Sequence, residues 1–275
     1  MNILFKSPKL WKDSATLAFT LLAVIETIMS VSVISLTCIQ KWWGRLLMII
    51  LAYCFLTIGI LIFKYTYSKK SITLSIRGIQ VTIKQGDLFK CNGWKLIPFD
   101  ERYDTQVDDI VINKNSLNGI FIEKYIGDEK FEEFQQIIFS VNDEKCTLFK
   151  RSKNGEHWIY PLGRIKTYQD YMLLAFNPIN EQNEVHTTRA KYEQCLRVMW
   201  QEISRTYANK PITLPLIGSG ITRFDDWAEK SNMELLKCIM CTLRTSQVHI
   251  NQPITILLTE EIVKGINLYE LKGVK

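Results

Sequence analysis

The sequence predicts an α-helical transmembrane hairpin followed by an α/β domain, in which helices flank a mixed, mostly parallel sheet. Three observations predict this class. Two long apolar segments lie in the first quarter of the chain, their flanks carry its whole excess of positive charge, and strand-like and helix-like patterns alternate in the second half. We therefore expect two domains, a hairpin in residues 1–70 and an α/β domain in residues 71–275.

The two apolar segments have the lengths of membrane spans. Residues 16–37 contain one ionisable side chain, Glu26, and as a helix they extend roughly 33 Å. Residues 46–63 contain no charge and extend about 27 Å. Trp42 and Trp43 lie between the segments, as is typical of a bilayer interface. A buried helical hairpin of a soluble protein is the alternative, and the flanking charges and aromatic side chains argue against it.

The distribution of charge predicts the orientation and the partners. Of 34 basic and 28 acidic residues, eight basic and two acidic ones lie in residues 1–70, so the remainder of the chain is neutral. Basic residues precede the first segment and follow the second, which predicts an inner-membrane protein with two spans and both termini in the cytoplasm. A neutral second domain disfavours nucleic acid as a partner. Seven cysteines, an odd number, agree with a reducing compartment.

Glu26 is the one carboxyl group inside the predicted spans. A charged side chain near the middle of a bilayer is costly and usually faces other protein groups. Two interpretations remain open. The helix is marginally hydrophobic and tolerates Glu26, or Glu26 makes a polar contact between hairpins or lines a pore in a homo-oligomer.

The second domain begins with strand-like alternation in residues 72–76 and 79–83. Its second half alternates strand and helix, as in an α/β sandwich with a mostly parallel sheet. The polar segment 99–119 is a long loop, and loops of this length usually serve a function. We expect further strands at 94–98, 146–149, 157–160, 171–176, 211–217 and 253–258, and helices at 131–139, 187–207, 225–244 and 260–271.

A small-residue loop follows the strand at 211–217 and reads Gly218-Ser219-Gly220-Ile221-Thr222-Arg223. In open α/β sheets, ligands bind beyond the carboxyl ends of the strands. Glycines allow a close backbone approach whose N–H groups cradle a diphosphate, and arginine adds charge-assisted hydrogen bonds. The loop matches neither the Rossmann G-x-G-x-x-G pattern nor the P-loop. A purely structural turn is the alternative.

Three features together resemble a macro domain, the ADP-ribose-binding fold: Gly86-Asp87-Leu88 after an early strand, residues 94–99 with a loop after them, and the loop at 215–224. The resemblance implies that Asp87 holds the adenine amino group and that the late loop encloses the diphosphate and distal ribose. The family's Asn-Ala-Ala-Asn stretch and triple-glycine loop are missing, which favours a binder without catalytic residues. The expected ligand-binding residues are Asp87, Leu88, Pro98, Phe99, Asp104, Thr105, Ser116, Leu117, Gly119, Gly218, Ser219, Gly220, Ile221, Thr222 and Arg223.

The hairpin and this domain together resemble the membrane-anchored macro-domain effectors of Thoeris anti-phage defence. The resemblance implies that a TIR-domain partner consumes NAD and makes an ADP-ribose-derived signal, for this architecture histidine-linked ADP-ribose. Binding of the signal would cause oligomerisation, membrane disruption and cell death or arrest. We expect no cofactor. A membrane-tethered hydrolase of ADP-ribose conjugates is the alternative, with candidate bases at Asp100, Glu101, Asp104, Asp108 and Asp109, and a scaffold for a protein partner is a third.

Other motifs give little support to metal or nucleophilic chemistry. Cys238 and Cys241 lie on one apolar helix face without a second pair, so we expect buried thiols and no zinc. Ser219 lacks the spacing of a nucleophile elbow. The acidic run at 104–109 is interpreted as a loop over the ligand that contacts ribose hydroxyls or a cationic group, with a solvated loop or a metal site as alternatives. We expect no metal and no catalytic residue.

Overall fold

The computed structural model describes residues 7–31, 41–68, 71–109, 111–139, 147–151, 155–178, 186–220, 222–228 and 230–273. The chain divides into two compact units. One comprises Met1–Ile72 together with Val263–Lys275, and the other comprises Thr73–Ile262. The C-terminal residues therefore group with the N-terminal helices, a feature that no sequence pattern indicated. The domain boundary expected between residues 70 and 71 stays a prediction.

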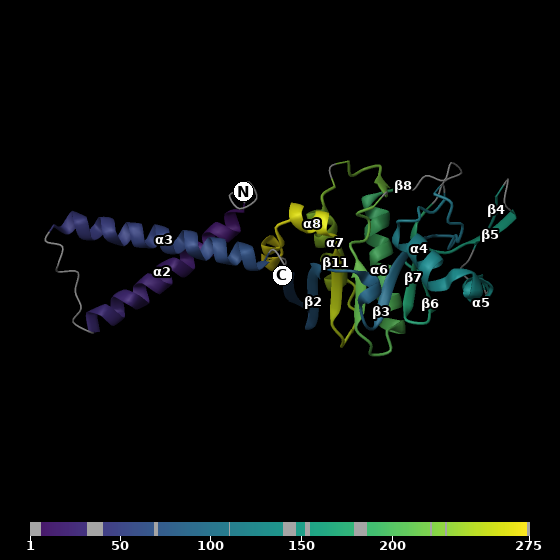
Figure 1. Ribbon diagram of the computed structural model, residues 1–275, viewed down its shortest axis with the longest axis horizontal. Coiled ribbons are helices and arrows are strands. Elements are labelled where there is room, and N and C mark those ends of the chain that lie inside the picture. The colour runs from purple at the N-terminus through teal and green to yellow at the C-terminus, as the bar shows by residue number, and fades with distance from the viewer. Residues whose placement is uncertain are drawn as a thin grey trace. The chain divides into compact units, whose positions relative to one another are not determined.

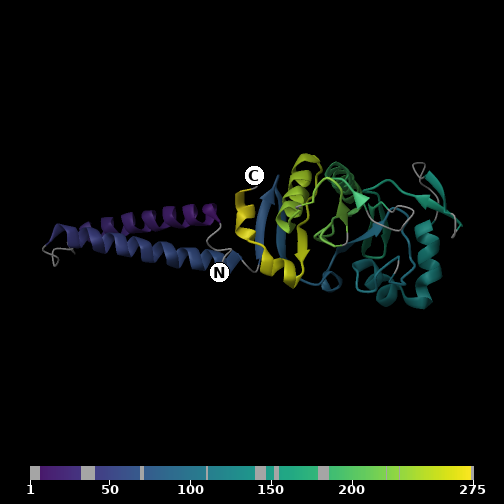
Figure 2. The same cartoon turned by 90° about the horizontal axis from the view of Figure 1, so that it is seen from above.

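Two long helices form the N-terminal part of the first unit, as the sequence predicts: α2 (Pro8–Val31) and α3 (Trp42–Ser68). They run side by side (Figure 2). Helix α2 begins with proline at its first position, and the Ser7 hydroxyl accepts a hydrogen bond from the Leu10 amide at 3.4 Å. The Tyr53 hydroxyl of α3 donates to the Ala15 carbonyl of α2 at 3.4 Å.

Among the described helices, α3 alone is long and apolar enough to cross a membrane, over Trp42–Thr66. Only 11% of its most apolar stretch is buried in the structure, so α3 is not a core helix of this chain. The expected first span, 16–37, continues past the end of α2 into residues 32–40, which lie outside the described residues. The presence of two spans therefore stays a prediction.

The second unit is built on a mixed sheet with the strand order β1-β2-β11-β9-β3-β7-β6 (Figure 1). Strands β2, β11, β9, β3 and β7 pair in parallel from each to the next, and β6 runs antiparallel to β7. The predicted mixed, mostly parallel sheet is thus confirmed. The strands are β1 (Ser71–Ile76), β2 (Ile79–Gln85), β3 (Trp94–Asp100), β6 (Ile165–Tyr168), β7 (Tyr171–Asn177), β9 (Ile212–Pro215) and β11 (Ile254–Leu258).

Helices cover both faces of the sheet (Figure 2). On one face, α6 (Arg189–Thr206) packs against α7 (Asn232–Thr245), and the Trp200 indole donates to Thr242 Oγ1 at 3.2 Å. On the other lie α4 (Leu117–Ile120), the π-helical segment η3 (Phe121–Ile126) and α5 (Gly127–Phe139), with Phe121 in the core. Because β3 and β7 are covered twice, their sequences are almost continuously apolar.

Several element boundaries differ from those expected. The helix expected at 225–244 begins only at Asn232, because Ser231 and Glu234 form a capping box there. The helix expected at 260–271 is divided into α8 (Glu260–Gly265) and the 3₁₀ helix η4 (Leu268–Gly273). Two short parallel strands, β8 (His186–Thr187) and β10 (Arg223–Phe224), were not expected. The strands expected at 146–149 and 157–160 are present as the antiparallel pair β4 (Thr147–Arg151) and β5 (Gly155–Ile159).

We expect Ser231→Ala to lower the free energy of unfolding by about 1 kcal/mol, because it removes the hydroxyl that accepts from the Glu234 amide. Urea unfolding measures this loss. Ser246→Ala at the other end of α7 is the matched control, since that hydroxyl only donates to the Leu243 carbonyl. Equal losses for the two variants would show that the capping box contributes nothing.

Candidate functional site

The predicted ligand-binding residues follow three strands of one parallel set. Asp87 comes two residues after β2, the segment with Asp104 and Thr105 follows β3, and the loop at 216–224 follows β9. Since the carboxyl ends of parallel strands meet at the same edge of a sheet, these three segments lie at one edge. That edge is where ligands of open α/β sheets bind.

The Asp87 carboxylate is oriented by the turn that it begins. Its side chain caps η2 (Leu88–Lys90), with Oδ1 accepting from the Phe89 amide at 3.0 Å. The Lys90 ammonium lies 3.7 Å from Oδ2, and the Asp87 side chain is 49% exposed. The carboxylate is therefore fixed and still accessible to a donor from a ligand. Leu88, by contrast, is packed in the hydrophobic core.

The segment Gly218–Thr222, here called the glycine loop, starts with a tight turn. Gly218 has φ +84°, and a Cβ at this position would lie 3.2 Å from the Tyr192 ring. The Ser219 hydroxyl and amide both donate to the Leu216 carbonyl, at 2.7 and 3.3 Å. Gly220 is exposed, with no atom within 4 Å of where a Cβ would be, and Ile221 lies outside the described residues. The loop therefore has no room for a side chain at Gly218, and its exposed residue Gly220 carries none.

Lys230 joins the two ends of the glycine loop. Its ammonium donates to the Gly218 carbonyl at 3.0 Å and also to the Thr222 carbonyl. It lies 4.3 Å from the centroid of the Phe224 ring, and burial lowers the pKa of Lys230. The oxygens of these two carbonyls would repel an anion. Because the ammonium binds both oxygens, it favours a loop conformation in which the N–H groups face a phosphate. Sequence reasoning missed Lys230, which belongs to no motif.

The far end of the glycine loop is fixed by strands β8 and β10. Arg223 lies in β10 and is exposed, while the amide of Asp225, the residue after β10, donates to the Thr187 carbonyl at 2.9 Å. His186 Nδ1 lies 2.7 Å from Asp225 Oδ1. Thr222 Oγ1 donates to Asn177 Oδ1 at 3.2 Å. The loop is therefore connected to the end of β7 and to the start of α6.

The loop after β3 begins with a buried carboxyl group. Asp100 Oδ1 accepts from the amides of Arg102 and Asp104, both at 2.9 Å. Burial raises the pKa of Asp100 to about 6. The Glu101 amide donates to the Asn177 carbonyl at 3.0 Å, so this loop and the glycine loop meet at the same residue of β7.

The acidic run at 104–109 folds on its own backbone. Asp104 Oδ1 accepts from the Gln106 amide at 3.1 Å, and Asp108 Oδ1 accepts from the Val111 amide at 2.7 Å. Asp109 Oδ1 accepts from the Lys114 amide at 2.9 Å. Within the described ranges, no group of three His, Cys, Asp or Glu side chains is arranged to hold a metal ion.

The remaining predicted residues of this region support the loop from within. Phe99 is buried, with its ring centroid 6.0 Å from that of Tyr103, and Pro98 lies beside it in β3. Thr105 Oγ1 accepts from the side-chain amide of Gln135 at 3.4 Å. Ser116 caps α4 by accepting from the Gly119 amide at 3.2 Å, and Leu117 begins that helix. Whether these residues touch a ligand stays a prediction.

Residues 81–259 match the family model described as Thoeris protein ThsA, Macro domain. This chain belongs to that family. Among its ThsA relatives, Thoeris protein ThsA of Bacillus amyloliquefaciens (strain Y2) is 32% identical over 280 residues, covering 98% of this chain and 93% of the relative. The family expected from the sequence is confirmed, and every predicted site residue lies inside the matched range.

Solved macrodomain structures from Oceanobacillus iheyensis are also similar to this ThsA-family chain. The macrodomain with MES bound has a TM-score of 0.47 and 15% identity, covering 74% of this chain and 94% of that one. The same macrodomain with ADP has a TM-score of 0.46 and 14% identity, with the same coverages of 74% and 94%.

We expect Asp100→Asn to change the pH dependence of stability. The folded-state pKa is raised from 3.8 to about 6, so the stabilising protonated form is present at low pH and lost as the pH rises through 6. Asparagine still accepts from both amides and cannot ionise. The free energy of unfolding of Asp100→Asn minus that of the wild-type chain should therefore increase by about 2–3 kcal/mol between pH 4 and pH 7. A difference that is constant with pH in urea unfolding would contradict this.

We expect Lys230→Met to loosen the glycine loop, because the carbonyls of Gly218 and Thr222 lose their common donor. Hydrogen exchange of the amides at 216–224 should become about 10-fold faster, the effect of about 1.4 kcal/mol. Lys237→Met, an exposed lysine of α7, is the matched control and should leave these rates unchanged. Equal exchange in the two variants would remove Lys230 from the site.

Proposed function

We propose that this chain is a membrane-anchored sensor of an ADP-ribose derivative in Thoeris defence. The observation that carries the proposal is the meeting of Asp87, the loop after β3 and the glycine loop at one edge of the sheet, in a chain of the ThsA macro-domain family. A half-exposed carboxylate suits an adenine amino group, and the glycine loop with Lys230 behind it suits a diphosphate. Arg223 adds a positive charge beside that loop.

The membrane part of the proposal rests on the exposed apolar surface of α2 and α3. Phe19 is 68% exposed and Phe55 is 80% exposed, and large aliphatic side chains are exposed along both helices. An apolar surface this long is not tolerated in water and fits a bilayer. Together with the basic flanks, it supports a multi-pass protein of the inner membrane whose termini are both cytoplasmic.

The proposed signal is histidine-linked ADP-ribose made by a TIR-domain partner enzyme. Signal binding drives homo-oligomerisation, and the clustered hairpins disrupt the membrane, leading to cell death or arrest. A ligand moves such a two-state equilibrium from 1:99 to 99:1 when it binds the associated form about 10⁴-fold more tightly, about 5.5 kcal/mol. Glu26, exposed on α2, is available for contacts between hairpins.

A membrane-tethered hydrolase of ADP-ribose conjugates is the second candidate. Asp100 favours it, because a carboxyl group with a pKa of about 6 at the binding edge is suited to general acid–base chemistry. Incubation with a protein or peptide ADP-ribosyl conjugate, followed by mass spectrometry, distinguishes the candidates. Release of free ADP-ribose that is lost in Asp100→Asn would establish the hydrolase and overturn the pure sensor.

We expect the chain to bind ADP-ribose at least 10-fold more tightly than inosine diphosphate ribose, in which a carbonyl oxygen replaces the adenine amino group. The Asp87 carboxylate accepts from the amino group and repels that oxygen. In Asp87→Asn the preference for ADP-ribose over inosine diphosphate ribose should become smaller or reverse. The asparagine side-chain amide can donate to the carbonyl oxygen of the inosine base. Isothermal titration calorimetry measures all four affinities.

Asp170→Asn is the matched control for this experiment. Asp170 is an acidic residue in the turn before β7, at the amino edge of the sheet, where it pairs with Lys210 at 3.1 Å. Its substitution should leave the preference for adenine unchanged. Equal affinity of the wild-type chain for both nucleotides would sink the assignment of Asp87, and absence of ADP-ribose binding would sink the sensor.

A further inference from the structure

Within the first compact unit, the 3₁₀ helix η4 packs against the start of α2 and the end of α3. Tyr269 of η4 is 3% exposed and forms a buried apolar cluster with Leu10 of α2 and Leu61 of α3. Trp11 and Tyr65 pack at the edge of this cluster. The C-terminal segment is therefore an integral part of the hairpin's packing.

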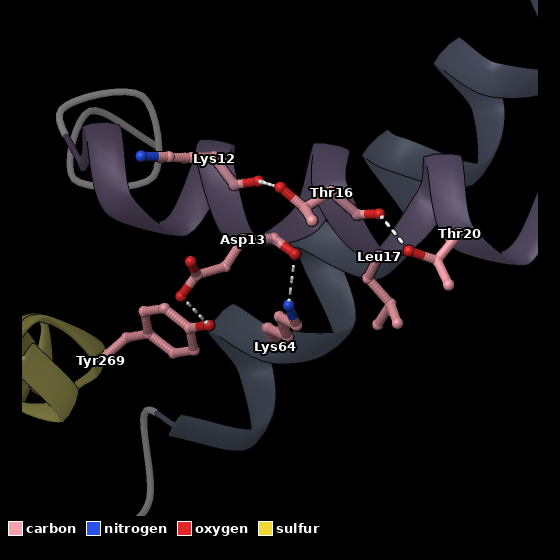
Figure 3. A pocket seen from close by; sticks show the side chains of 7 residues that line it. All are labelled: Lys12, Asp13, Thr16, Leu17, Thr20, Lys64 and Tyr269. Atoms are coloured by element: carbon pink, nitrogen blue, oxygen red, sulfur yellow. Dashed lines mark hydrogen bonds between the residues drawn. The ribbon is translucent and has the colours of Figure 1, made fainter.

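A polar contact fixes this packing in register (Figure 3). The Tyr269 hydroxyl donates to Asp13 Oδ2 at 2.8 Å, and the Lys64 ammonium donates to the Asp13 carbonyl oxygen at 2.9 Å. The ammonium groups of Lys64 and Lys272 lie 6.0 and 4.8 Å from the centroid of the Tyr269 ring. Burial and the bond to Asp13 raise the pKa of Tyr269 to about 12, so its hydroxyl remains a donor at neutral pH.

The same C-terminal segment begins at the binding edge of the sheet. The last two residues of β11 accept hydrogen bonds from both ligand loops: Leu257 from the Leu216 amide at 3.1 Å, and Leu258 from the Gly86 amide at 3.3 Å. Leu216 precedes the glycine loop, and Gly86 precedes Asp87. Only ten residues, 259–268, separate β11 from Tyr269, and α8 makes up more than half of them.

We propose that residues 259–273 form a coupling arm, and that the hydrogen bond between Tyr269 and Asp13 is a latch that ligand binding at the two loops releases. When the loops enclose a diphosphate, the amides of Gly86 and Leu216 shift and pull on the end of β11. Only ten residues join β11 to Tyr269 along the chain, so we expect the displacement to reach Tyr269. An open pocket of about 360 Å³ lies beside the latch and is lined by Asp13, Lys64 and Tyr269 together with other side chains of α2.

The latch rests on the proposed function, because it gives the sensor a route from its ligand to its hairpin. Coupling between two sites is reciprocal. If ligand binding opens the latch, a variant whose latch is already open binds the ligand more tightly. A residue outside the ligand loops would then change ligand affinity in a predictable direction.

The experiment uses the full chain in lipid nanodiscs, with ADP-ribose as the probe. We expect Tyr269→Phe to lower the dissociation constant about 5-fold, the small end of allosteric couplings. The ring stays in its apolar cluster, so the fold should be retained. Tyr53→Phe is the matched control: its hydroxyl also joins α3 to α2, by donating to the Ala15 carbonyl at 3.4 Å, but does not touch the arm. Its dissociation constant should equal that of the wild-type chain.

Asp13→Ala removes the acceptor and provides an independent test. Asp13→Ala and the double variant Asp13→Ala/Tyr269→Phe should both have the dissociation constant of Tyr269→Phe. Loss of either partner already removes the hydrogen bond, so a second substitution adds nothing. Unchanged or weakened affinity in Tyr269→Phe would overturn the latch while leaving the sensor intact. Additive effects in the double variant would also overturn it.

A second measurement separates failure of the latch from failure of the proposed function. Without any nucleotide, hydrogen exchange of the amides at 8–17 should be faster in Tyr269→Phe than in Tyr53→Phe. Equal exchange would overturn the latch whatever the ligand proves to be. Absence of ADP-ribose binding by the wild-type chain would overturn the proposed function instead.

Discussion

Strand β11 lies between β2 and β9 in the parallel part of the sheet, and its final carbonyls accept from residues beyond both neighbouring strands. This pairing sets the position of three features with a proposed function. It aligns the carboxyl ends of β2 and β9, so the turn of Asp87 and the glycine loop leave the same edge. It also sets where the C-terminal segment starts. A change in the register of β11 would displace all three together.

Polar groups organise the edge of the sheet where we propose that the ligand binds. Asp100 accepts from two amides of its own loop, Ser219 closes the turn of the glycine loop, and Lys230 occupies two carbonyls. Each contact fixes a backbone segment that would otherwise have to be ordered on binding. Since ordering a loop costs free energy, a preformed edge leaves more of the binding energy for affinity and for driving a change elsewhere in the chain.

The sequence allows the main elements to be predicted because their signals are local. Buried strands such as β3 and β7 are apolar runs, and the turn at Gly218 requires a residue that adopts positive φ. The missed features depend on contacts between distant residues. Thr222 bonds to Asn177, Lys230 reaches back to Gly218, and Tyr269 bonds to Asp13 across 256 positions. No periodicity marks such pairs, and an aspartate that precedes an apolar segment is interpreted first as a flanking charge.

Asp13 shows why the position of a charge matters more than its sign. In the count of charges it only reduces the basic excess of the hairpin by one. In the structure its carboxylate accepts from Tyr269 and its carbonyl accepts from Lys64, so it joins η4, α2 and α3. Near a bilayer surface the net attraction to anionic lipid comes from the surrounding lysines. Asp13 is therefore free to serve the packing of the hairpin. The latch that we propose requires a contact of this moderate strength, because a bound ligand has to release it. An apolar cluster alone would bind η4 without fixing its orientation. One hydrogen bond to a carboxylate is directional, and the free energy of binding a ligand is large enough to break it.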